Sequence, residues 1–193
     1  MVHKPREYTE PTTHPLEEHP DYVRAIGMVS LEAVAIELRM ANLLARMLGL
    51  PPRIGQAIYL TPKSETTRIE ILRNAAHSRL AVSPSRKKSV LGRQMTKALA
   101  DVNRICGRAQ GLINLRHRMI HDEWNYSDKE KNVTRRQIDG VPGRQRVPTP
   151  KKEIDDLIEK MRVLIDDVLV LTTAFRDHPP FMANMRSDLA KSG

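Results

Sequence analysis

The chain has 193 residues and a formal net charge of +9, from 32 Lys and Arg against 23 Asp and Glu. This length suits one domain with a hydrophobic core, and no apolar run reaches the roughly 18–20 residues of a membrane span or forms a signal segment. Cys106 is the only cysteine, which excludes a disulfide framework and a cysteine metal cluster and makes the reducing cytoplasm the expected compartment.

The first 20 residues contain four prolines and little apolar content, which predicts a disordered or loosely ordered arm over 1–20. Apolar residues then recur at helical spacing, so a helical domain is expected over 21–177, with a frayed tail at 178–193. Helices are predicted from Asp21 to about Leu48, from Thr61 to about Val82, from Ser83 through the region of His121, and from Thr149 to about Phe175.

Start and stop signals support these helices. Gly49 is expected to end the first helix, since glycine at a C-cap is followed here by two prolines. The other three helices each begin with Ser or Thr followed by proline, which has no N–H to leave unpaired in the first turn. The inner face of the first helix is predicted to be Val23, Ile26, Ser30, Val34, Ala41, Leu44 and Leu48.

Residues 125–148 do not show helical spacing. Val133 and Ile138 are their few strand formers and 139–143 is a turn signal, so an irregular loop and a small β-hairpin both remain open. The predicted fold is therefore all-α, a four- to five-helix bundle, mainly antiparallel, with an irregular basic loop or small hairpin before the last helix. Since no Walker loop or dinucleotide fingerprint is present, no cofactor is expected.

Positive charge is concentrated on both sides of the end of the long third helix. Nine bases stand against Asp101 over 86–118, and eight bases stand against three acids over 127–152. Clustered positive charge favours a polyanionic partner, although a solvated basic face would look the same. The candidate contacts for such a partner are Arg118, Arg135, Arg136, Arg144 and Arg146.

One apolar stripe runs along that third helix and is broken by a charge. Its places are Leu91, Met95, Ala98, Val102, Ile105, Ala109 and Leu112. The next two places on the stripe are Arg116 and Met119. Because burying a charge costs several kcal/mol unless it is paired or faces water, Arg116 requires a partner or a functional cavity.

Two histidines follow this arginine. His117 and His121 share one helical face with Asn114, because the three positions are separated by three and four residues. Arg116 and His121 are five residues apart, about 140° around a straight helix. They can converge only if the helix loosens near Ile120 or if a second chain completes the site.

The segment Arg116-His117-Arg118-Met119-Ile120-His121 resembles the arginine-polar-x-x-x-histidine motif of HEPN domains, small helical proteins that include many RNA-cleaving toxins. Family members more often carry Asn or Asp after the arginine, where this chain has His117. The resemblance extends over roughly 21–176. It includes the motif's place late in a long helix, a following tryptophan, a basic loop and one more helix.

The resemblance implies a metal-independent endoribonuclease whose site is built across a homodimer. Arg116 would stabilise the scissile phosphate, His121 would act in proton transfer, and His117 and Asn114 would have supporting roles. The products would carry a 2′,3′-cyclic phosphate and a 5′-hydroxyl. A toxin or phage-defence setting, with an antitoxin or regulatory protein as a further partner, is also implied by the family alone.

Three alternatives stay open. The chain could be a catalytically silent HEPN-like helical dimerisation or RNA-binding module. It could instead bind a metal through His117 and His121, although Arg118 stands where a zincin has glutamate. In the third alternative Arg116 is a structural residue, paired to Glu32 or Glu37 of the first helix, with the histidines on the polar surface.

Overall fold

The computed structural model describes residues 16–127, 132–136 and 147–177. In this part of the chain five helices and three short strands follow one another, which confirms the predicted all-α bundle of four to five helices; of the predicted loop and hairpin, the structure has the hairpin. The elements are α1 (Pro20–Leu48), α2 (Pro52–Leu60), α3 (Glu65–Leu80), α4 (Val90–His121), β1 (Glu123–Ser127), β2 (Asn132–Arg136), β3 (Val147–Pro148) and α5 (Lys151–Asp177).

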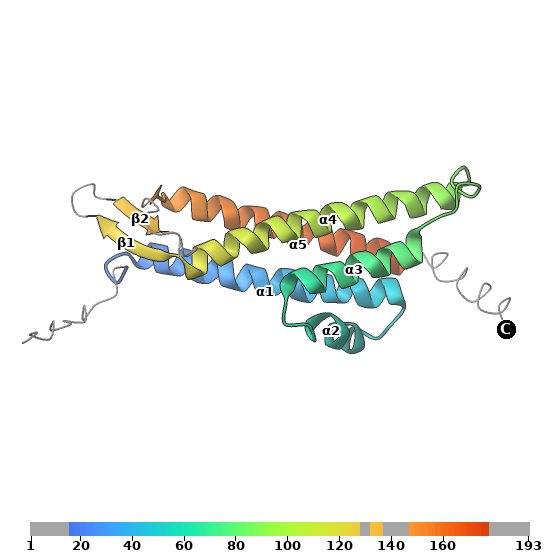
Figure 1. The fold of residues 1–193 in the computed structure, drawn as a ribbon, viewed down its shortest axis with the longest axis horizontal. Helices are drawn as coiled ribbons and strands as arrows, with labels where there is room; N and C mark the ends of the chain where they lie inside the picture. The colour runs from blue at the N-terminus through green and yellow to red at the C-terminus, as the bar shows by residue number, and fades with distance from the viewer. Residues whose placement is uncertain (1–15, 128–131, 137–146, 178–193) are drawn as a thin grey trace, which may run out of the picture.

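The long helices α1, α4 and α5 lie side by side along the length of the molecule (Figure 1). As predicted, α4 runs antiparallel to its neighbours. By contrast, α1 and α5 run in the same direction, and Glu32 of α1 accordingly pairs with Arg162 of α5 at 2.8 Å. The reason is α2, which leads the chain back beside α1 so that α3 starts again in the direction of α1 (Figure 1).

The helix starts were predicted too early in two places. The N-cap of α3 is Ser64, whose hydroxyl accepts from the Thr67 amide, and the N-cap of α4 is Ser89, whose hydroxyl accepts from the Gly92 amide. In both cases a hydroxyl free to cap lies closer to the helix than the Ser/Thr-Pro pair does. The left-handed Gly49, with φ 68°, ends α1 as expected, and α5 begins directly after Thr149-Pro150.

The core confirms the stripe of α4 and corrects the face of α1. Along α4, Val102, Ile105 and Ala109 are at most 1 % exposed. On α1, however, Val23 is 50 % exposed and Val34 is 53 % exposed, because α1 carries apolar residues on two faces and spacing alone does not tell which face is covered. The buried face of α1 consists mainly of Ala25, Val29, Ala33, Ile36, Met40, Leu43 and Leu44.

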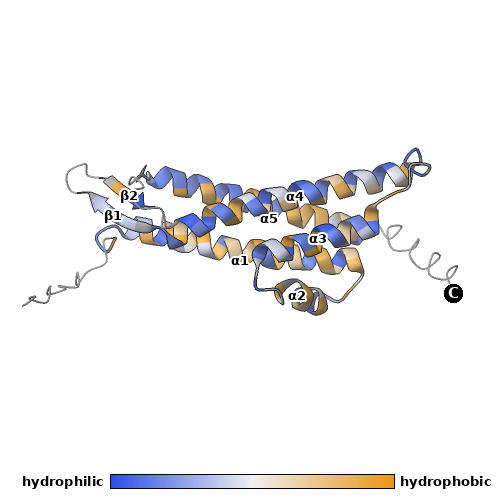
Figure 2. Cartoon of the chain, viewed as in Figure 1, coloured by the Kyte–Doolittle hydropathy of each residue, from blue (hydrophilic) through white to orange (hydrophobic). Residues whose placement is uncertain are grey.

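The short helix α2, predominantly hydrophobic in Figure 2, closes against the C-terminal half of α1. Gly55 makes this approach possible, because a Cβ atom at that position would lie only 2.3 Å from the Cβ of Ala45. None of the helices in the described ranges is long and apolar enough to cross a membrane.

Between α4 and α5 the chain forms a small antiparallel sheet in the order β1-β2-β3. Of the two predicted strand formers, Val133 lies in β2 and is 3 % exposed, whereas Ile138 and the turn signal at 139–143 lie outside the described residues. On the N-terminal side of α1, Leu16 is 2 % exposed and belongs to the hydrophobic core, although it precedes the predicted start of the domain at 21. Residues 1–15 and 178–193 also lie outside the described ranges.

Candidate functional site at the end of α4

Arg116 lies at the wall of a cavity of about 440 Å³ between the start of α3 and the last turns of α4. Its side chain is 25 % exposed, whereas Leu112 and Met119, its neighbours on the apolar stripe, are 7 % and 1 % exposed. The stripe therefore opens at Arg116 into a cavity that reaches solvent.

Glu65, the first residue of α3, contacts the first two residues of the motif, Arg116 and His117. Its Oε1 accepts from Nη1 of Arg116 at 3.3 Å, and its Oε2 lies 2.7 Å from Nε2 of His117. The three side chains form one cluster that bridges α3 and α4.

This cluster corrects the expected partner of Arg116. Glu37 of α1 forms an ion pair with Arg68 of α3, and Glu32 pairs with Arg162 of α5, so both glutamates of α1 are engaged elsewhere. The alternative in which Arg116 pairs with Glu32 or Glu37 therefore named the wrong carboxylate. An arginine–carboxylate pair exists, but with Glu65, which the sequence analysis did not single out.

The ion pair between Arg116 and Glu65 contributes too little free energy to folding to explain an arginine at position 116. An ion pair in which both side chains are only 20–25 % exposed is weak evidence for stability, because the lost hydration of the two charges offsets their attraction. The Nε atom of Arg116, meanwhile, is buried and has no hydrogen-bond partner among the described residues. Because such a donor costs about 1–3 kcal/mol, the cluster in this arrangement does not stabilise the fold enough to explain Arg116.

His117 and His121 lie with their rings stacked at 5.6 Å between centroids and 21° between planes. His117 is half exposed beside Glu65, and His121 is exposed in the last turn of α4. Since α4 remains α-helical through His121, the helix does not loosen near Ile120, and His121 does not line the cavity at Arg116. Of the two routes to convergence that the sequence left open, only completion by a second chain remains.

Asn114 and Arg118 lie on the outer side of the same helix. Asn114 is exposed, lines the cavity and accepts a long hydrogen bond of 3.4 Å from Gln110, so its amide is available to a ligand. Arg118 is exposed in the last turn of α4, where a base also stabilises the helix dipole. Upstream, Gly107 and Gly111 are exposed, and a Cβ atom on either would meet nothing within 4 Å in the described structure.

Of the four bases predicted after the motif, Arg135 and Arg136 lie within the described residues. Arg135 is 15 % exposed and lies between Asp122, at 3.5 Å, and Glu153, at 3.4 Å, so it ties the end of α4 to β2 and α5. Arg135 therefore pairs with acids of the chain itself, and its contact with a polyanion stays a prediction. Arg136 is exposed on β2, whereas Arg144 and Arg146 lie outside the described residues.

We expect Arg135→Ala to lower the free energy of unfolding by about 2 kcal/mol, because it removes the ion pair between Arg135 and the nearly buried Asp122. If the chain binds RNA, as its charge distribution predicts, the salt dependence of that binding should stay unchanged, since this guanidinium does not face solvent. Denaturant titration and RNA binding at several salt concentrations measure the two effects. A weaker salt dependence of RNA binding, together with wild-type stability, would show that Arg135 contacts RNA and contradict this prediction.

Trp124 belongs to the core. Its Nε1 donates to the Met119 carbonyl at 2.9 Å and the side chain is 8 % exposed, so it seals the end of the apolar stripe and is not available to stack on a base. Tyr126 is half-buried, with its ring 4.2 Å from that of His19. Cys106 is also buried, and burial raises the pKa of its thiol to about 11, as expected for an inert cysteine.

The metal-binding alternative gains no support from the donor set. Within the described residues no group of three or more His, Cys, Asp and Glu side chains is close enough to share a metal ion. His117 turns its Nε2 toward Glu65, and His121 only stacks on its ring.

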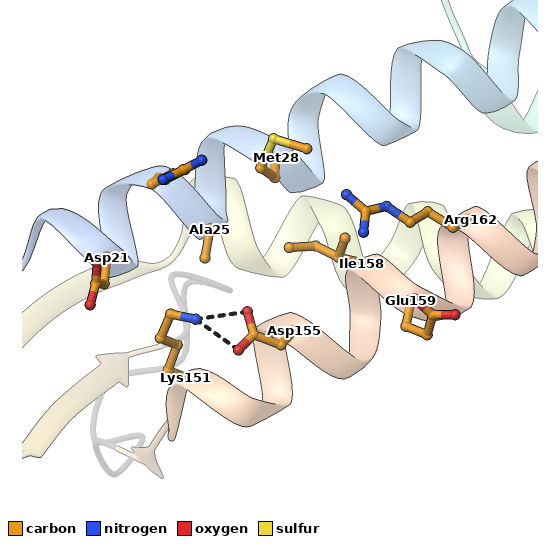
Figure 3. Close-up of a pocket in the computed structure, with 9 residues that line it drawn as sticks. Asp21, Ala25, Met28, Lys151, Asp155, Ile158, Glu159 and Arg162 are labelled. Carbon is orange, nitrogen blue, oxygen red and sulfur yellow. Dashed lines mark hydrogen bonds and ion pairs between the residues drawn. The ribbon is translucent and has the colours of Figure 1, made fainter.

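A second cavity, of about 530 Å³, lies on another side of the bundle between α1 and α5 (Figure 3). Its charges are balanced within the chain, since Lys151 contacts Asp155 at 2.8 Å and Arg162 contacts Glu32. It contains no residue of the motif. The cavity at Arg116 is therefore the better candidate for a functional site.

Comparison of the chain with protein-family models, with curated proteins and with solved structures gave no match.

Proposed function

We propose that this protein is a metal-independent endoribonuclease of the HEPN type, with Arg116 and His121 as its principal catalytic residues. The observation that carries the proposal is the position of Arg116 at a cavity open to solvent, with an incompletely satisfied guanidinium, where the rest of the stripe is apolar. An arginine stays charged and matches two phosphate oxygens, so this position suits the scissile phosphate of RNA.

The site is completed by a second copy of the chain. Within one chain His121 lies outside the cavity that Arg116 lines, and α4 is straight between them. A two-fold arrangement of the motif ends would bring His121 of each copy toward Arg116 of the other. The exposed glycines of α4 leave room there for another backbone.

In this cleft Arg116 stabilises the charge of the phosphorane and His121 takes part in proton transfer. Asn114 and the exposed Arg118 and Arg136 contact the neighbouring nucleotides. From the family resemblance we further propose a cytoplasmic toxin or phage-defence enzyme, with an antitoxin or regulatory protein as a partner.

We expect the purified protein to cut single-stranded RNA equally well with and without EDTA. The fragments should carry a 2′,3′-cyclic phosphate and a 5′-hydroxyl, because the 2′-oxygen is the nucleophile and no metal-bound water takes part. Mass spectrometry of the fragment ends checks the products. Cleavage that EDTA abolishes, or products with a 5′-phosphate, would contradict this mechanism.

A second candidate is a catalytically silent module for helical dimerisation or RNA binding. The pairing of Arg116 with Glu65 favours it, because that carboxylate takes one of the amino groups that a phosphate would use. The module predicts RNA binding with no cleavage under any condition, so the same assay separates the two candidates.

A further inference from the structure

The proposed reaction requires one more group, a base for the 2′-hydroxyl, and Glu65 lies in the cavity where that base is needed. Cleavage through the 2′-oxygen needs a base for the 2′-hydroxyl, a cation for the phosphorane and an acid for the leaving 5′-oxygen. Arg116 supplies the cation, but a single histidine, His121, cannot be base and acid at the same moment. The cavity holds a carboxylate that contacts Arg116 directly.

We propose, resting on the function proposed above, that Glu65 is the general base of the cleavage reaction. Its Oε1 is 3.3 Å from Nη1 of Arg116, so a phosphate bound to this guanidinium places its own nucleotide beside the carboxylate. The 2′-oxygen and the scissile phosphorus belong to adjoining positions of one nucleotide. A group next to the phosphate site is therefore also next to the hydroxyl.

The contacts of Glu65 orient it for this role and leave it able to accept a proton. Each carboxylate oxygen has one partner in the chain, Arg116 for Oε1 and His117 for Oε2, and each oxygen has a further lone pair. Because a carboxylate only accepts hydrogen bonds, His117 must present Nε2–H to it. His117 is thus a positioning residue, which accounts for histidine at the second place of the motif.

Other charged groups around Glu65 keep it from repelling the RNA. Arg116 and His117 of α4, Lys63 before α3 and Arg68 on α3 line the same cavity, against the single further acid Glu37 of α1 among the described lining residues. Since Arg68 and Glu37 pair with each other, Lys63 and Arg116 remain to offset the carboxylate and the phosphate.

Glu65 takes the proton of the 2′-hydroxyl, and the O2′ electron pair forms a bond to phosphorus. The bond from phosphorus to O5′ breaks, its electron pair stays on O5′, and the imidazolium of His121 gives that oxygen a proton. The products are a 2′,3′-cyclic phosphate and a 5′-hydroxyl, after which Glu65 returns its proton to water and His121 takes one up.

The test compares Glu65→Gln with Glu37→Gln, a matched control that lines the same cavity and has nearly the same side-chain exposure, 21 % against 20 %. We expect Glu65→Gln to lower kcat by roughly 10²-fold or more, with KM little changed, and to remove the fall of activity at acidic pH. Glu37→Gln should keep the wild-type kcat and the wild-type pH profile.

A substrate whose scissile O5′ is replaced by sulfur separates base from acid, because a thiolate leaves without a proton. On this substrate His121→Ala should recover most of its lost rate, whereas Glu65→Gln should stay slow. If the wild type cuts RNA and Glu65→Gln cuts it as fast, or if sulfur rescues Glu65→Gln, the role of Glu65 is wrong while the proposed function stands. If the wild type and Arg116→Ala are equally inactive on every RNA, both proposals fail.

Discussion

Replacing Arg116 with alanine lowers kcat for RNA cleavage by on the order of 10³-fold if this guanidinium stabilises the transition state. The effect is large because the charge sits in a cavity between α3 and α4, where it is screened less than on an open surface. KM should change much less, since the exposed bases of α4 continue to bind the RNA backbone.

The control for this change is Arg104→Ala on the same helix, an exposed arginine paired only locally with Asp101 in the described structure. It removes the same charge from α4 and should leave kcat unaltered. The thermal stability of the variant distinguishes a catalytic role of Arg116 from a structural one. Arg116→Ala removes a weak ion pair together with an unsatisfied donor. We therefore expect its melting temperature to match the wild type or to exceed it. A strong loss of stability would support the structural alternative for Arg116.

His121→Ala is expected to lower kcat by about 10²–10⁴-fold, the range for removing a group that transfers a proton in the transition state. His121 is exposed and makes only a ring contact with His117 among the described residues, so the substitution should not disturb the fold. His77→Ala, which changes another exposed helical histidine, is the control. Wild-type cleavage by His121→Ala would remove this histidine from the mechanism.

Much of the fold could be predicted because helix spacing and stop signals act locally. The stripe of α4, the glycine that ends α1 and the start of α5 depend only on neighbouring residues. The buried face of α1 could not be predicted in the same way, since Val23 and Val34 are exposed only because no other element covers them. The parallel course of α1 and α5 likewise depends on how α2 folds back.

The candidate site was likewise predictable only where it depends on neighbouring residues in the sequence. Arg116 was conspicuous because a charge interrupts an apolar stripe, a pattern visible along one helix. Glu65 was not, because it is 51 residues away in sequence and meets Arg116 only after α3 packs on α4. The one local signal was Ser64, an N-cap that places Glu65 in a first turn, but a first-turn acid is common and has no function by itself.

The most direct test of the shared site mixes two inactive variants, Arg116→Ala and His121→Ala, after the subunits have been unfolded and refolded together. If Arg116 of one chain acts with His121 of the other, half of the dimers contain one intact site of two, and activity returns to about a quarter of the wild-type value. If the mixture stays as inactive as each variant alone while the wild type refolded in the same way is active, the catalytic site does not combine these two residues across a dimer.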